Sequence, residues 1–154
     1  DPPIRVREFD RTISAVLYTG EERSLSAQEA TPFAIVSVDC EGIFSTFSPE
    51  PLGLPSALYG GFGLGHVARD PFVKVVESDR FQAMARDIDA GIEKCRGGCS
   101  YFRFCGGGAP ANKYFENGSF DSSETLFCRL HRKALAEVLL SKLQGPRPRY
   151  VDAA

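Results

Sequence analysis

The sequence predicts an α+β protein, with a small β-hairpin, a cysteine-rich loop region and flanking helices. Three observations lead to this fold class. Two short apolar segments on either side of Glu41-Gly42 are typical of a hairpin. Apolar residues recur at helical spacing in three other segments. Between the last two of these segments, residues 95–128 combine four cysteines with a glycine triplet and are expected to be mostly loop.

Composition places the chain among ordinary globular proteins. Its 154 residues suffice for one domain or two small subdomains, and 43% of them are hydrophobic. A formal net charge of -2 is no reason to expect binding to nucleic acid or to an anionic membrane. No apolar run could span a bilayer, and no signal peptide is visible. The chain begins at Asp1 and has Met84 as its single methionine, so we expect a piece of a longer protein.

The first part of the chain is expected to form a helix and then a hairpin. Apolar residues over positions 6–17 have the spacing of an amphipathic helix, whereas residues 20–32 are polar and loop-like. Residues 33–38 and 43–47 read as two strands, and Glu41-Gly42 is the turn between them.

A long loop and two helices are expected next. Residues 48–65 hold many glycines and prolines, and they form either a solvated connector or part of a substrate-facing surface. Residues 71–76 suit a short helix with Asp70 as its cap and Pro71 at its first position. Ser78 can cap a second helix that ends near Cys95. Its apolar stripe is expected to pack in the core and consists of Phe81, Met84, Ala85, Ile88 and Ile92.

The last part is expected to contain a second hairpin and a final helix. Residues 113–120 suggest a tight hairpin around Asn117-Gly118. A helix follows Cys128 and ends at Gly145-Pro146, and residues 147–154 form a frayed tail. The residues expected to face inward on this helix are Leu130, Ala134, Leu135, Val138, Leu139 and Leu143.

Four of the five cysteines lie between positions 95 and 128. Cys95, Cys99 and Cys105 are separated by three and then five residues, and Cys128 follows after a longer excursion. Three clustered thiolates and a distant fourth can surround a metal centre. The triplet Gly106–Gly108 lets the backbone turn tightly and direct N–H groups towards sulfur. Aromatic residues between the second and third cysteines can shield such a centre from water, namely Tyr101, Phe102 and Phe104.

Other uses of four cysteines are weighed against a cluster. The odd cysteine count and a sizeable core disfavour disulfides, and scattered buried thiols do not account for the adjacent glycine triplet. Four thiolates suit either a zinc ion or an iron–sulfur cluster. A triplet plus one favours a cubane cluster, because zinc ribbons usually present two pairs of cysteines. Reduced thiols for either metal imply a reducing cytoplasm.

The remaining polar residues suggest no catalytic group. Cys40 is expected to be a buried apolar residue. His66 and His131 are isolated, and His131 is expected on a solvated helix face. The sequence has no Ser/His/Asp or Cys/His nucleophile pattern and no phosphate loop. Four polar residues are expected to make turn and cap bonds that position Cys128, with substrate binding as the alternative: Asn112, Lys113, Glu116 and Glu124.

A longer motif extends this pattern. Residues 95–129 read C-x3-C-x-Y-F-x-x-C-G-G-G-x-P-x-N-K-x-x-E-N-G-x-F-x-x-x-E-T-x-x-C-R. This run resembles the C-terminal SPASM domain of radical S-adenosylmethionine (SAM) peptide maturases, and is most similar to the GrrM-like and cyclophane-forming group. Residues 32–50, PFAIVSVDCEGIFSTFSPE, are similar to the same group. The resemblance implies a SPASM-type fold in which residues 1–20 link to a radical SAM barrel outside this chain, residues 21–144 form the auxiliary cluster domain, and residues 145–154 form a tail.

The chain departs from the full family pattern in its cysteines. A full SPASM domain carries seven cysteines and two auxiliary 4Fe-4S clusters, but Ala109 and Phe47 stand at two of the cysteine positions. The resemblance therefore implies that the first auxiliary cluster is missing. It implies one auxiliary 4Fe-4S cluster, with the metal ligands Cys95, Cys99, Cys105 and Cys128. The spacing between the first two is one residue longer than the family pattern.

The resemblance also implies a function. The cluster would accept electrons, position the substrate, or do both, in an enzyme that modifies a ribosomally synthesised peptide. Expected partners are the precursor peptide, the radical SAM domain and a reductant such as flavodoxin or ferredoxin. SAM would bind only in that other domain, because the radical SAM cysteine triplet has three and then two intervening residues, so this chain alone is expected to be inactive. The alternative is a zinc-stapled protein- or peptide-binding module without redox activity.

Overall fold

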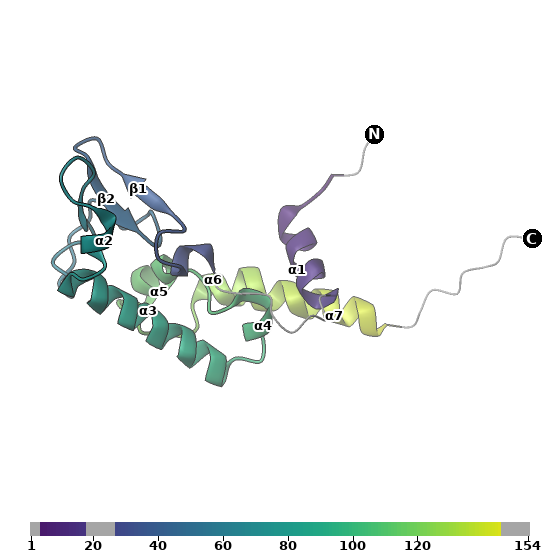
Figure 1. Ribbon diagram of the computed structural model, residues 1–154. Coiled ribbons are helices and arrows are strands. Elements are labelled where there is room, and N and C mark those ends of the chain that lie inside the picture. Colours follow the sequence, from purple (N-terminus) through teal and green to yellow (C-terminus); the bar gives the residue numbers. More distant parts are fainter. Residues whose placement is uncertain (1–3, 18–26, 146–154) are drawn as a thin grey trace, which may run out of the picture.

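The computed structural model describes residues 4–17 and 27–145 and has an α+β fold, which confirms the expected class (Figure 1). The sheet and α2 lie at one end, α3 runs along one side, and α7 extends to the other end, where it meets α1 (Figure 1). The elements are α1 (Arg7–Leu17), a 3-10 turn (Gln28–Ala30), β1 (Val36–Val38), β2 (Ile43–Thr46), β3 (Gly65–His66), α2 (Phe72–Val75), α3 (Asp79–Gly98), α4 (Phe102–Cys105), α5 (Pro110–Asn117), α6 (Leu126–Cys128), a π-helical turn (Arg129–Lys133) and α7 (Ala134–Gln144).

The first hairpin is confirmed: β1 and β2 pair antiparallel. Asp39 closes its turn, since its Oδ1 accepts the N–H groups of Glu41 and Ile43, each at 2.9 Å. Gly42 adopts φ +83°, a conformation that glycine takes without strain. The two-residue strand β3 extends the sheet beside β2 and was not expected, because it begins at the end of the glycine-rich segment 48–65.

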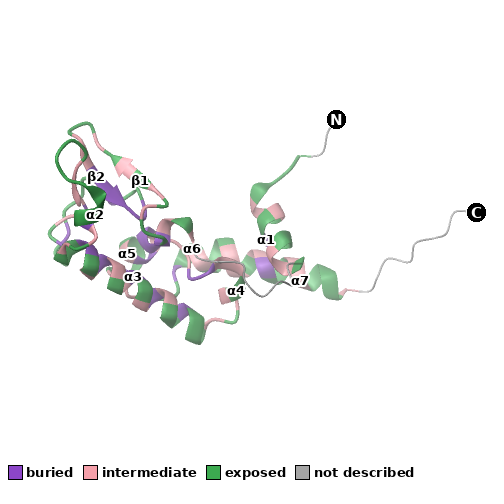
Figure 2. Cartoon of the chain, viewed as in Figure 1, coloured by how far each residue is buried: buried purple, intermediate pink, exposed green. Residues whose placement is uncertain are grey.

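Aromatic side chains make up most of the buried core, which lies between β2 and α3 (Figure 2). The segment 48–65 contributes Tyr59 and Phe62 to this core, so it is more than a solvated connector. The Tyr59 ring stacks on Phe120 with 5.3 Å between ring centres, and its hydroxyl donates to Asp87 at 2.7 Å. Burial and this carboxylate raise the pKa of the Tyr59 phenol. The largest buried side chains of the core are Phe44, Phe47, Tyr59, Phe62, Phe81, Met84, Ile88 and Phe120.

Helix α3 agrees with the sequence analysis at its start and along its apolar stripe. Ser78 is its N-cap, and its Oγ accepts the N–H group of Phe81 at 3.3 Å. The stripe faces the core, with all five residues buried or packed against it. The expectation for α2 is wrong in one respect: Pro71 occupies the N-cap position. Asp70 cannot serve there, because its carboxylate accepts the N–H group of His66 at 2.8 Å and closes the turn after β3.

The expected hairpin over residues 113–120 is wrong, because most of this segment belongs to helix α5. Pro110 stands at the start of α5, where a missing N–H group costs nothing. Gly118 ends the helix at φ +80°, and its N–H group donates to Tyr114 O at 2.8 Å. An Asn-Gly pair suits the end of a helix as well as a hairpin turn, and in this structure it ends helix α5.

The helix expected after Cys128 is present but does not bury the expected face. Leu130, Val138 and Leu143 are each more than half exposed, whereas Ala136 is fully buried. The physical reason is the π-helical turn between α6 and α7. Such a turn inserts one extra residue and rotates everything after it, so a regular 3.6-residue period read through Cys128 points at the wrong residues. The helix ends before Gly145 as expected.

Helix α1 forms over nearly the expected residues and packs against α7 and α4. Thr12 is its buried residue, and its hydroxyl donates to Glu8 O at 2.9 Å. Much of the helix remains exposed, including Phe9 and Leu17 (Figure 2). The expected loop over residues 20–32 lies largely outside the described residues, and the expected tail over 147–154 lies entirely outside them. No helix in the described part of the chain is both long and apolar enough to cross a membrane.

Candidate metal centre

The four clustered cysteines border one cavity of about 620 Å³. Cys95 lies in the last turn of α3 and Cys99 is the residue that caps its end. Cys105 ends α4, and Cys128 ends α6. The fold thus brings Cys128 to the wall that the other three share, as the sequence spacing predicts. All five cysteines lie in the described part of the chain and all are free thiols.

Among the described residues, the cysteine side chains do not form a ready-made site for a single ion. Within residues 4–17 and 27–145, no three His, Cys, Asp or Glu side chains are placed to hold a single metal ion. A zinc ion with four thiolates requires Zn–S distances of about 2.3 Å, so its ligands must converge closely. A four-iron cluster takes its four cysteines at different iron atoms and therefore needs more widely spaced sulfurs.

The glycine triplet folds the chain back against α3. The φ angles of Gly106–Gly108 are 64°, 103° and 75°, a run that glycine alone adopts readily. A Cβ on Gly107 would lie 3.1 Å from Ile92 Cγ1, so the missing side chain permits close packing. The Cys95 thiol donates to Gly107 O at 3.7 Å. The N–H groups of Gly106 and Gly108 donate to Phe102 O and Cys105 O, so for these two glycines the expectation that the N–H groups turn towards sulfur is wrong.

Aromatic rings cover part of the cavity wall. Phe102 and Phe104 line it as expected, and Phe127 adds a third ring that the sequence analysis did not single out. Tyr101 is not among the lining residues. Its hydroxyl donates to Glu137 on α7 at 3.0 Å, so it joins the cysteine loop to the last helix.

Burial is the largest influence on the pKa of two of the four thiols. It raises the pKa of Cys95 and of Cys128, and the charges of Cys99 and Cys105 raise both further. For Cys95 the ammonium of Lys113 acts in the opposite direction. Burial lowers the pKa of Lys113, which is only 3% exposed, and the Cys95 thiolate counteracts this. A metal that binds here must therefore displace protons from sulfur.

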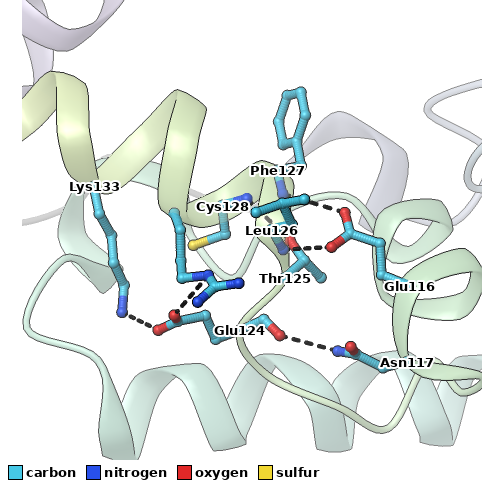
Figure 3. A network of polar contacts seen from close by, with 9 residues as sticks. Glu116, Asn117, Glu124, Thr125, Leu126, Phe127, Cys128 and Lys133 are labelled. Atoms are coloured by element: carbon cyan, nitrogen blue, oxygen red, sulfur yellow. Dashed lines mark hydrogen bonds and ion pairs between the residues drawn. The ribbon is translucent and has the colours of Figure 1, made fainter.

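The backbone before Cys128 is held by side chains from two directions (Figure 3). Thr125 is the N-cap of α6, and its Oγ1 accepts the N–H group of Cys128 at 3.0 Å. Glu116 reaches over from α5 and accepts the N–H groups of Leu126 and Phe127, the latter at 3.2 Å. The expectation that Glu116 positions Cys128 through cap bonds is confirmed.

A second set of contacts holds the residue before that cap (Figure 3). Asn117 Nδ2 donates to Glu124 O at 3.0 Å. The Glu124 side chain accepts a hydrogen bond from Lys133, which lowers the pKa of Glu124. Arg129 lies 3.6 Å from the same carboxylate. Glu124 therefore also has a structural role, while Asn112 lines the cavity.

The remaining singled-out residues lie elsewhere. Cys40 is exposed, so the expectation of a buried apolar residue is wrong; it belongs to the turn of the first hairpin, beside Asp39. His131 is exposed as expected and stacks on Phe127 with 4.5 Å between ring centres. His66 lies in β3, and neither histidine lines the cysteine cavity.

Ala109 and Phe47, which stand where the family pattern has cysteines, lie in different surroundings. Ala109 lines the cavity. Phe47 is 2% exposed in the aromatic core, where its ring stacks on Phe81 with 5.6 Å between centres. Its φ of +70° is unusual for a residue with a side chain. At this position the chain thus has a packed hydrophobic residue.

The sequence analysis expects turn or cap bonds from Lys113, which the structure instead buries, and it does not single out Gly91. Lys113 is a buried lysine, which is rare without a charge partner. Gly91 lies in the middle of α3, where glycine costs about 1 kcal/mol relative to alanine, and this unfavourable choice is the signal that marks it. A Cβ at Gly91 would lie 2.2 Å from Phe120 O and 3.0 Å from Lys113 Nζ.

Comparison with known proteins finds one informative relative. The chain is 45% identical over 144 residues to an uncharacterized protein of Synechocystis sp., an alignment that covers 94% of this chain. The chain spans 36% of the length of that relative, about a third. No family model matches the chain. No solved structure matches it either.

Proposed function

We propose that this chain is the auxiliary-cluster domain of a radical SAM/SPASM enzyme that modifies a ribosomally synthesised peptide. Its ligands for one 4Fe-4S cluster are Cys95, Cys99, Cys105 and Cys128. The observation that carries the proposal is the cavity of about 620 Å³ that all four thiols border. The motif over residues 95–129, which resembles that of the family, supports the same ligand set.

The cysteine spacing supports a cluster over zinc. Three cysteines close together and a distant fourth suit a cubane cluster, whereas zinc ribbons usually present two pairs of cysteines. Phe102, Phe104 and Phe127 add the apolar wall that limits access of water to such a centre. Phe47, packed in the core, supports a single cluster in place of the family's usual pair.

The residues of this chain would hold, orient and shield the group. The thiolates bind it, the glycine turn places Cys105 near α3, and Glu116 and Thr125 fix the backbone at Cys128. When bound, the cluster supplies a site that can take up one electron. The protein then tunes its potential through burial and nearby charge.

A longer protein is part of the proposal. The greater length of the Synechocystis relative supports a further region, which would be the radical SAM barrel that binds and cleaves SAM. The precursor peptide, and a reductant such as flavodoxin or ferredoxin, would be partners of that whole enzyme in the cytoplasm.

Metal analysis of protein purified and reconstituted without oxygen tests the proposal. We expect a brown protein with iron and acid-labile sulfide in about equal amounts, near four of each per chain. A colourless protein that binds one zinc after the same treatment would replace the cluster with the zinc-stapled module. Omitting oxygen is essential, because aerobic loss of a cluster would mimic that second result.

A second experiment tests whether this chain alone can cleave SAM. The reconstituted chain alone, reduced and supplied with SAM, should release no 5′-deoxyadenosine, because four thiolates leave no iron atom open to bind SAM. Anaerobic chromatography measures the product. Release of deoxyadenosine by this chain would refute a closed auxiliary site.

A further inference from the structure

Strand β1 has an open edge. The order of the sheet is β1-β2-β3, so within the described residues β1 pairs with β2 alone (Figure 1). Its sequence, Val36-Ser37-Val38, contains neither a charge nor a proline, the residues that commonly protect an edge strand from further pairing. The two valines are 40% and 50% exposed. An uncharged edge of this kind can accept another strand.

The free backbone groups of this edge belong to the two valines. In an antiparallel pair, successive residues alternate between exchanging hydrogen bonds with the residue opposite and pointing away from it. The N–H group of Leu64 donates to Phe44 O at 2.8 Å, so Phe44 turns its backbone groups towards β3. Val38 stands opposite Phe44, and its backbone groups therefore point the other way, out of the sheet. Val36 is two residues earlier and has the same orientation.

This edge is complementary to a second copy of itself. The sequence Val36-Ser37-Val38 reads the same in both directions. If two copies pair antiparallel about a two-fold axis at Ser37, Val36 of each copy stands opposite Val38 of the other, and each such pair can exchange two hydrogen bonds. The valine side chains then meet on one face of the sheet. Asp39 comes opposite Ile35 of the other copy, so no like charges face each other.

We propose that β1 is the contact of a symmetric dimer, in which the β1 strands of two copies of this chain pair antiparallel and join their sheets into one. A second copy fits because the symmetry that places it also supplies the matching residues. The strand is short, so the dimer is expected to be weak and to depend on protein concentration. No residue of β1 lines the cysteine cavity, and the pairing of two copies does not depend on the proposed function.

Two double variants test the pairing, and both remove the same two valines. Val36→Lys with Val38→Lys places like charges opposite each other in the dimer, whereas Val36→Lys with Val38→Glu places opposite charges there. Val73→Lys is the control, because Val73 is an exposed valine outside β1, on α2. Sedimentation velocity of the full chain, with its thiols reduced and over a range of concentrations, measures the dimer.

We expect the wild-type protein to form a dimer whose fraction rises with concentration. The variant with two lysines should associate severalfold more weakly, whereas the variant with lysine and glutamate, and Val73→Lys, should stay near wild type. A wild-type protein that remains monomeric at every concentration would overturn the proposal. An unchanged dimer in the variant with two lysines would also overturn it, as would equal loss of the dimer in both double variants.

A cross-linking experiment covers the case in which the double variants fail to fold, which circular dichroism detects. Ser37→Cys is made together with Cys40→Ala, which removes the exposed thiol of the hairpin. At the proposed axis the two Cα atoms at position 37 would be about 4.5 Å apart, within reach of a disulfide. We expect oxidation to link two copies there severalfold faster than in a Val73→Cys variant with the same Cys40→Ala change. Non-reducing gels and peptide mass spectrometry measure the link, and equal rates would overturn the proposal.

Discussion

The carboxylate of Glu116 accepts the N–H group of Phe127, the residue before Cys128, at 3.2 Å. It also accepts the N–H group of Leu126, so one side chain of α5 satisfies two of the free donors at the start of α6. This contact ties the last cysteine to a helix that begins only five residues after Cys105. All four cysteines thus lie at or next to helix ends, and they border one cavity.

Replacing Glu116 with alanine should loosen Cys128. We expect Glu116→Ala to lower the free energy of unfolding by about 1 kcal/mol, the usual cost of a lost cap, and to speed iron loss to a chelator. Urea denaturation and iron release measure these effects. Glu93→Ala is the control, since Glu93 makes only an exposed ion pair with Arg96 on α3. Equal behaviour of the two variants would contradict a capping role.

Gly91 and Gly97 of α3 should respond oppositely to alanine. At Gly91 the new Cβ would lie 2.2 Å from Phe120 O, so we expect Gly91→Ala to destabilise the protein by about 1 to 3 kcal/mol despite the better helix propensity of alanine. At Gly97 no atom lies within 4 Å of the new Cβ, so Gly97→Ala should be neutral or stabilise by up to about 1 kcal/mol. Thermal and urea unfolding compare the two, and a Gly91→Ala protein as stable as wild type would disprove the close approach.

Replacing a cysteine should affect iron binding only where the cysteine borders the cavity. Cys105→Ala and Cys128→Ala should each lose most bound iron and part of the protein's stability, because the metal orders a region built of short helices and turns. Cys40→Ala should keep its iron, since Cys40 lies exposed in the hairpin turn. Iron and sulfide assays on anaerobically reconstituted variants are the measurement. Iron loss in the Cys40 variant would show that the ligand set is misassigned.

The stability of the metal-free protein should depend on pH through the thiols of Cys95 and Cys128. The folded state raises the pKa of Cys95 and Cys128, so it resists ionisation that the unfolded chain allows. The contribution of these thiols to the free energy of unfolding is fully present below about pH 8.5, and it is lost as the pH rises through the folded pKa values. Urea denaturation from about pH 7.5 to about pH 9.5 should show this fall, and Cys128→Ala should show less of it. A flat profile in wild type would contradict the burial effect.

Local chemistry predicted the elements whose signals lie close together in the chain. Asp39 and Gly42 form the first hairpin turn without help from distant residues. Ser78 starts α3, and the apolar stripe after it turns towards the core. The spacing of the four cysteines predicted that they share one site, and they border one cavity.

Two of the predictions from the sequence are wrong because the same local pattern is compatible with two different structures. Asn117-Gly118 suits a hairpin turn or the end of a helix, and Pro110 and the contacts of α5 select the helix. A regular helical period after Cys128 predicts that Leu130 and Val138 face inward, but Leu130 lies in the π-helical turn, which shifts the phase of α7, and both residues are exposed. A one-residue insertion in a helix leaves no mark in composition.

The hairpin, the amphipathic α1 and α3, and the group of Cys95, Cys99 and Cys105 with its glycine turn could be predicted from the sequence, because each depends on residues a few positions apart. The burial of Lys113 against α3 and the close approach of Gly91 to Phe120 follow from the tertiary structure and could not be predicted from the sequence. These contacts join segments that are distant in the chain. Their geometry follows from how α3 and α5 pack around the cavity, and no local preference of either segment encodes it.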